Sequence, residues 1–143
     1  MASHENAEAC WAGIPFEGIT DAPTVSDKRR SLIELRNELA LACAVELMLG
    51  SHAGQARPVL ERLVESDPYQ EDACALLALA LYQQRRQAEA LKRLGILRKR
   101  LRNDLGITPS PAVQQLELAI LNQTDPELAG RNLLSPMSTW TGD

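Results

Sequence analysis

Cysteine and histidine are the residues of this chain that could bind a metal or act as nucleophiles, and they are few and scattered. The cysteines are Cys10, Cys43 and Cys74, and the histidines are His4 and His52. The cysteine spacing fits neither a disulfide framework nor a CxxC metal site, so we expect buried free thiols. His52 falls in a predicted turn between helices, where a capping or solvent-exposed role is expected. With no HExxH, GxSxG or phosphate-loop motif in the sequence, we predict no metal, no cofactor and no enzymatic activity.

Basic side chains form the one distinctive chemical group. Residues 69–106 carry eight Lys/Arg and four acids, a balance of +4 in a chain whose net charge is −4. At 100° per residue, most of them cover the outer face of one predicted helix, opposite its leucines. Such a face is either a solvated surface or a docking strip for nucleic-acid phosphates or an acidic protein. The candidate partner-binding residues are Arg85, Arg86, Lys92, Arg93, Lys99 and Arg100.

The composition of the chain favours a single all-α domain. Its 143 residues include 23 Leu and 19 Ala but only five aromatic residues, so helix formers dominate and strand formers are scarce. The longest apolar run, residues 73–82, is about half of what a bilayer span requires. The N-terminus has no basic leader followed by an apolar stretch. We therefore expect a cytoplasmic protein with no membrane association.

Five helices are predicted from apolar periodicity and from residues that begin or end helices. Their ranges are 26–49, a segment between the turn at 51–52 and Asp67, 69–84, 87–105 and 111–122, with Ser26, Asp67 and Ser110 as N-caps and Gly50 and Gly106 as terminators. Pro68 and Pro111 take the first helical positions, and Pro58 kinks the second helix or makes its first turn irregular. Residues 1–24 are expected to be mostly loop, held to the body by Trp11 and Phe16, and residues 123–143 a linker or frayed tail.

An internal repeat is the most informative pattern. Sliding the sequence by 34 residues pairs Cys43 with Leu77, Ala44 with Ala78, Leu47 with Leu81, Ala56 with Ala90, Leu60 with Leu94, and Leu63 with Leu97. A generic Leu/Ala-rich bundle also gives such matches, but here the loop positions align too, and 34 is the tetratricopeptide period. We predict a tetratricopeptide-like helical-hairpin repeat, two units plus capping helices in a right-handed superhelix, with residues 8–24 and the fifth helix covering the ends.

Two segments carry a family resemblance. LYQQRRQAEAL at residues 81–91 and LRNDLGITPSP at residues 101–111 resemble the bacterial transcriptional activator domain of SARP-type (antibiotic regulatory protein) actinobacterial regulators. That family's pattern is LYxxGRQAEAL, then LxxxLG[IV]xPxP and a closing LxxxIL, which residues 116–121 match. The chain departs from the pattern at Arg85, where glycine is common, and at Leu94, where an aromatic residue is common; Pro58 is also unusual.

The resemblance implies a domain organisation and a set of partners. It covers residues 8–123, leaving residues 1–7 as a vector-derived start or disordered segment and residues 124–143 as a C-terminal linker or tail. In the family, a winged-helix domain precedes this one, and the two together bind promoter repeats and recruit RNA polymerase. No such domain precedes residue 8, so the chain is either a fragment or a stand-alone relative. The implied partners are RNA polymerase, the chain's own upstream DNA-binding domain, or a second copy in a homodimer, with DNA bound only through the separate domain.

Three functions remain open on the sequence alone. The leading hypothesis is a non-enzymatic regulatory domain that mediates self-association, polymerase contact or signal transmission through protein–protein contacts. The alternative is a ligand- or peptide-sensing module whose guest lies in the groove between helices one, three and five. The third is nonspecific contact of the basic face of helix four with the DNA backbone, because without interleaved aromatic residues base reading is not expected.

Overall fold

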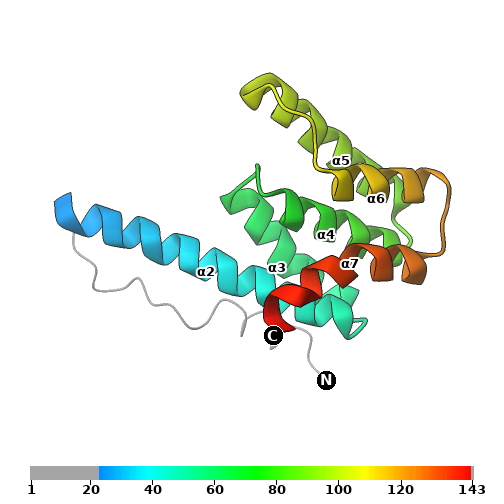
Figure 1. Ribbon diagram of the computed structural model, residues 1–143, viewed down its shortest axis with the longest axis horizontal. Helices are drawn as coiled ribbons and strands as arrows, with labels where there is room; N and C mark the ends of the chain where they lie inside the picture. Colours follow the sequence, from blue (N-terminus) through cyan, green and yellow to red (C-terminus); the bar gives the residue numbers. More distant parts are fainter. Residues whose placement is uncertain (1–22, 143) are drawn as a thin grey trace.

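The computed structural model describes residues 23–142, with side chains placed from residue 27 to residue 137. Seven helical elements follow one another in this part of the chain, and no strand occurs in it. They are α2 (Pro23–Leu49), α3 (Ala53–Ser66), α4 (Glu71–Gln83), α5 (Gln87–Arg100), the π-helical turn η1 (Leu101–Leu105), α6 (Pro111–Leu121) and α7 (Pro126–Gly142). The predicted all-α class is confirmed, and Figure 1 shows the stack of helices. None of the helices in the described range is long and apolar enough to cross a bilayer.

Helix α4 is the centre of the core. Ten consecutive residues, from Ala73 to Tyr82, are buried, as their uninterrupted apolar run predicts. Helices α3 and α5 pack against α4, and so do α6 and α7. The helix is therefore covered all round, and neighbouring helices on different faces communicate through it.

The two predicted repeat units are present. Helices α2 and α3 form one antiparallel hairpin and α4 and α5 the next, and the 34-residue pairs Ala44/Ala78, Ala56/Ala90, Leu60/Leu94 and Leu63/Leu97 are all buried. The alanines allow close approach of the paired helices, while the leucines fill the space beside them. The periodicity of the sequence thus reflects a repeated packing arrangement.

The turns of the repeat are also equivalent. Ser51 and Arg85, 34 residues apart, have positive φ angles of 64° and 67°. In each turn the next amide closes a six-residue ring, His52 N–H to Leu47 O at 2.8 Å and Arg86 N–H to Leu81 O at 2.8 Å. These bonds define the Schellman motif, whose left-handed residue is usually glycine. Gly50 precedes the left-handed position, so the expected terminator is displaced by one residue.

Arg85 is in a conformation that glycine adopts more easily. Replacing Arg85 by glycine is expected to raise the free energy of unfolding by about 0.5–1 kcal/mol, because the left-handed region strains a residue with a Cβ atom. Urea denaturation followed by circular dichroism measures the change. Arg86→Gly is the matched control, since Arg86 has a φ of −110° and pairs with Glu89, and we expect no gain there. A loss of stability in Arg85→Gly would show that the arginine side chain stabilises this turn.

Three predicted boundaries shift for identifiable reasons. Helix α2 begins at Pro23, so Ser26 lies inside its first turn and is not the N-cap. Asp67 is the C-cap of α3, and its Oδ1 accepts a hydrogen bond from Tyr69 N–H at 3.2 Å, which makes residues 67–70 a turn and starts α4 at Glu71 with Gln70 as N-cap. Helix α3 continues through Pro58 from Ala53 to Ser66.

The later boundaries agree better with the sequence. The predicted fourth helix is α5 followed by η1, and Gly106 ends it with a φ of 68°, as expected. Ser110 caps α6 by accepting a hydrogen bond from Val113 N–H at 3.4 Å, with Pro111 at the first helical position.

The interpretation of residues 124–143 as a linker or tail is wrong for the described residues. Helix α7 covers Pro126–Gly142, and its Ala129, Leu133, Leu134 and Met137 are buried. The Tyr82 hydroxyl donates to the carbonyl of Thr124, and Gln83 Nε2 donates to the carbonyl of Pro126 at 3.3 Å, so the start of α7 is tied to the end of α4. Contact with distant helices has overridden the local helix breakers.

Several expectations concern residues that lie outside the described range. These are the state of residues 1–7, the anchoring by Trp11 and Phe16, the end cap formed by residues 8–24, and the thiol of Cys10. Among the other cysteines, Cys74 is a buried free thiol as predicted. Cys43 is disulfide-bonded, so the expectation of a free thiol is wrong at that position.

Candidate partner-binding surface

The six candidate basic residues separate into three pairs. Arg85 and Arg86 lie in the α4–α5 turn, Lys92 and Lys99 lie on the exposed ridge of α5, and Arg93 and Arg100 line a groove between α3 and α5. The separation follows from helix geometry, because residues 93 and 100 are seven apart on one stripe that points about 90–100° away from Lys92. The single docking strip expected from the sequence is therefore a groove wall beside an exposed ridge.

The groove, called the α3–α5 groove below, has a volume of about 450 Å³. Arg93 and Arg100 line its α5 wall, and Glu61 and Glu65 line its α3 wall. Its apolar lining consists of Val64, Pro68, Leu77, Ile96 and Leu97, with the thiol of Cys74 among them. A cleft with an apolar base and walls of opposite charge suits a peptide segment with an aliphatic side chain flanked by charged ones.

Cys74 lies in the floor of the α3–α5 groove. Burial raises the pKa of its thiol to about 11, although the positive charges of Arg100 and Arg93 act in the opposite direction. Its Sγ contacts the carbonyl oxygen of Pro68 at 3.7 Å. The thiol is therefore protonated at neutral pH and contributes an apolar surface to the groove floor.

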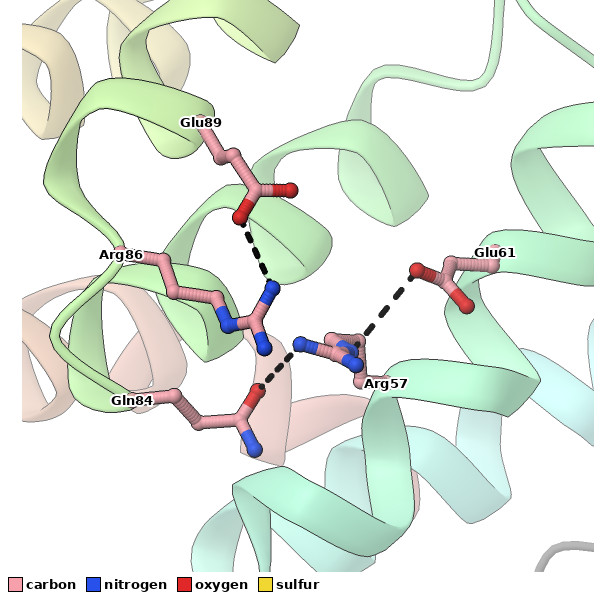
Figure 2. A network of polar contacts seen from close by, with 5 residues as sticks. All are labelled: Arg57, Glu61, Gln84, Arg86 and Glu89. Atoms are coloured by element: carbon pink, nitrogen blue, oxygen red, sulfur yellow. Dashed lines mark hydrogen bonds and ion pairs between the residues drawn. The ribbon is translucent and has the colours of Figure 1, made fainter.

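A polar network links α3 to the α4–α5 turn at the start of α5. Arg57 Nη1 donates to Gln84 Oε1 at 3.3 Å and Arg57 Nε lies 3.8 Å from Glu61 Oε2, while Arg86 Nη1 lies 2.9 Å from Glu89 Oε1. Figure 2 shows the guanidinium groups of Arg57 and Arg86 pointing into the same space between α3 and the turn. Arg86 is thus partly neutralised by an exposed ion pair, which stabilises the surface little.

Two acidic positions on the groove and one arginine in this network were missed by the sequence analysis. Glu61 and Glu65 are four residues apart, so one helix face was a readable signal, but their partner helix was not. Arg57 precedes Glu61 by the same spacing. The charge-divided groove could be recognised only once α3 and α5 were placed together.

The predicted groove between helices one, three and five is not open. Those helices are α2, α4 and α6, and α7 contacts all three of them. A cavity of about 540 Å³ remains between α4, α6 and α7, where burial and the neighbouring Glu71 raise the pKa of the Asp72 carboxyl. Within residues 23–142 no group of three His, Cys, Asp or Glu side chains is placed to hold a metal ion.

Comparisons with known proteins agree with the fold and the sequence pattern. Residues 1–121 match the family described as the bacterial transcriptional activator domain. The chain is 38% identical over 120 residues to the regulatory protein AfsR of Streptomyces coelicolor, which covers 83% of this chain and 12% of AfsR. It is 36% identical over 102 residues to the regulatory protein DnrI of Streptomyces peucetius, which covers 71% of this chain and 35% of DnrI.

A solved structure shows the same architecture. Mycobacterium tuberculosis EmbR, in complex with a low affinity phosphopeptide, matches with a TM-score of 0.71 and 26% sequence identity, over 97% of this chain and 38% of that chain. The chain therefore spans between 12% and 38% of the length of these three relatives.

Proposed function

Because this chain belongs to the bacterial transcriptional activator domain family, we propose that it is the protein-contact module of a transcription regulator and that the α3–α5 groove receives the partner. The family relationship identifies a regulatory domain of a transcription factor. The observation that supports the groove as the contact is its division of charge, with Arg93 and Arg100 facing Glu61 and Glu65 across an apolar floor. Opposed charges fix the orientation of a bound segment, and the apolar floor supplies affinity.

RNA polymerase is the partner tested first, followed by the upstream DNA-binding domain and a second copy of the chain. The segment that fits the groove carries an acidic side chain toward Arg93 and Arg100 and an aliphatic one toward Ile96 and Leu97. Ile96 is 41% exposed, which leaves apolar surface for such a contact. The exposed ridge residues Lys92 and Lys99 would then raise the rate of encounter more than the affinity.

Reversing the charge of the groove wall is expected to weaken polymerase binding at least tenfold. The change is Arg93→Glu with Arg100→Glu, which leaves four carboxylates around the groove and no cation to pair with an acidic segment. Biolayer interferometry with immobilised chain and the RNA polymerase holoenzyme of Streptomyces coelicolor measures the affinity, and light scattering after gel filtration measures self-association.

The matched control is Lys92→Glu with Lys99→Glu, which changes the net charge by the same amount on the adjacent ridge. We expect a smaller loss there than in the groove variant. Equal losses in both variants, together with salt-dependent retardation of duplex DNA by the wild type, would replace the groove with a nonspecific polyanion contact. A wild-type chain that binds neither polymerase, nor the upstream domain, nor itself would overturn the proposed function.

A further inference from the structure

Helix α7 lies on the face of the molecule opposite the α3–α5 groove. Cys74 and Leu77 of α4 face that groove, whereas Leu79 and Gln83 face α7, and about 160° of helix rotation separates the two sides. Helix α7 crosses α4 and reaches the C-terminal end of α2 (Figure 1). The surface that it covers, made by α2, α4 and α6, is called the inner face below.

The contacts of α7 are those of a helix bound in a groove. Its apolar stripe places Ala129, Leu133 and Met137 four residues apart, with Leu134 beside them, and all four are buried. Gly130 approaches α4 so closely that a Cβ atom there would lie 2.7 Å from Gln83 Nε2. A small residue followed by aliphatic residues one and two turns later is therefore the pattern that the inner face accepts.

Helix α7 does not fill the surface that it covers. A cavity of about 540 Å³ lies on its α6 side and another of about 920 Å³ on its α2 side. Both are lined by Pro136, which has no N–H to donate within the helix. Empty space on both flanks means that contacts available to a better-fitting helix are not made.

We propose that the inner face is a receptor for an amphipathic helix, that α7 is its resident occupant, and that a partner helix with the same small–aliphatic–aliphatic stripe displaces α7. The resident helix is joined to α6 by a short link at residues 122–125, so its high effective concentration keeps the surface closed without a competitor. Displacement would free α7 and open the inner face at once, a two-state change that both sites sense. This surface is separate from the α3–α5 groove, so its test does not depend on the proposed function.

The experiment uses the full chain and a fluorescein-labelled peptide of its own residues 126–142. The variant Leu133→Asp with Leu134→Asp weakens the resident helix, because two carboxylates cannot be buried on the inner face. Fluorescence anisotropy is expected to show at least tenfold tighter peptide binding to this variant than to the wild type. Leu128→Asp is the matched control, since Leu128 is 43% exposed on the same helix, and it should bind the peptide as weakly as the wild type.

Hydrogen exchange on the wild type provides a second measurement that does not rely on a variant. Amides of residues 127–137 are expected to exchange at least tenfold faster than those of α4, through opening of α7 alone. A folded double variant that does not bind the peptide would overturn the proposal. If the double variant unfolds, exchange of α7 and α4 at one common rate in the wild type would overturn it instead.

Discussion

Replacing Leu94 by alanine is expected to lower the free energy of unfolding by about 2–5 kcal/mol. Leu94 is 1% exposed in the second repeat unit, and Leu60, its partner 34 residues earlier, is fully buried in the first. Truncation removes apolar contacts and leaves a cavity that the closely packed helices fill only in part. Because the two positions are equivalent, Leu60→Ala should cost a similar amount. Urea denaturation followed at 222 nm measures both.

The control for this pair is Ile96→Ala. Ile96 lies two residues from Leu94 on the same helix but is 41% exposed, so its truncation should cost less than about 1 kcal/mol. A cost at Leu94 no larger than at Ile96 would contradict the assigned core. A difference of more than about 2 kcal/mol between Leu60→Ala and Leu94→Ala would show that the two hairpins are not energetically equivalent units.

The repeated part of the fold was predictable because its determinants are local and periodic. Ala44 and Ala78 recur at one period with Leu60 and Leu94, and the stripes that they form fix which helix faces meet. The Ser110-Pro111 signal likewise predicted where α6 begins. What the pattern could not supply was the backbone strain at Arg85, which became visible as a turn equivalent to that of Ser51.

Helix α7 escaped the sequence analysis because breakers were given more weight than caps. Asp125 Oδ2 accepts a hydrogen bond from Leu128 N–H at 3.2 Å, and Pro126 takes the first helical position, the same signal that predicted α6. Gly130 and Pro136 then suggested a loop. Gly130 is instead required by the close approach to α4, a contact between segments far apart in sequence that no local pattern contains.

The candidate surface was predicted in composition but not in arrangement. The helical projection correctly placed Lys92, Arg93, Lys99 and Arg100 away from the buried leucines of α5. It could not show that α3 stands beside Arg93 and Arg100 and faces them with two glutamates. Whether a basic side chain is a solvated one or part of a groove wall depends on the neighbouring helix, and that information is tertiary.

Alkylation of Cys74 in the folded protein is expected to be at least about 100-fold slower at pH 8 than in the urea-unfolded chain. Burial raises the pKa of its thiol from 9.0 to about 11, so the reactive thiolate falls from about one-tenth to about one-thousandth of the population. Iodoacetamide labelling, followed by mass spectrometry of the peptide containing Cys74, measures the rate at this site separately from the other cysteines.

The pH profile separates the pKa of Cys74 from simple shielding of its sulfur. In the folded protein the rate should keep rising about tenfold per pH unit from pH 8 to pH 10, whereas in the unfolded chain it should level off above pH 9. The shift also links stability to pH: the folded pKa is the higher one, so the unfolded state loses its proton first, and the stability that the thiol provides below pH 9 is lost as the pH rises through about 11. That loss approaches about 2–3 kcal/mol and should be absent in Cys74→Ala. A slow rate that levels off at pH 9 in the folded protein would mean that restricted access alone protects the sulfur, and that the groove floor is more polar than its lining residues indicate.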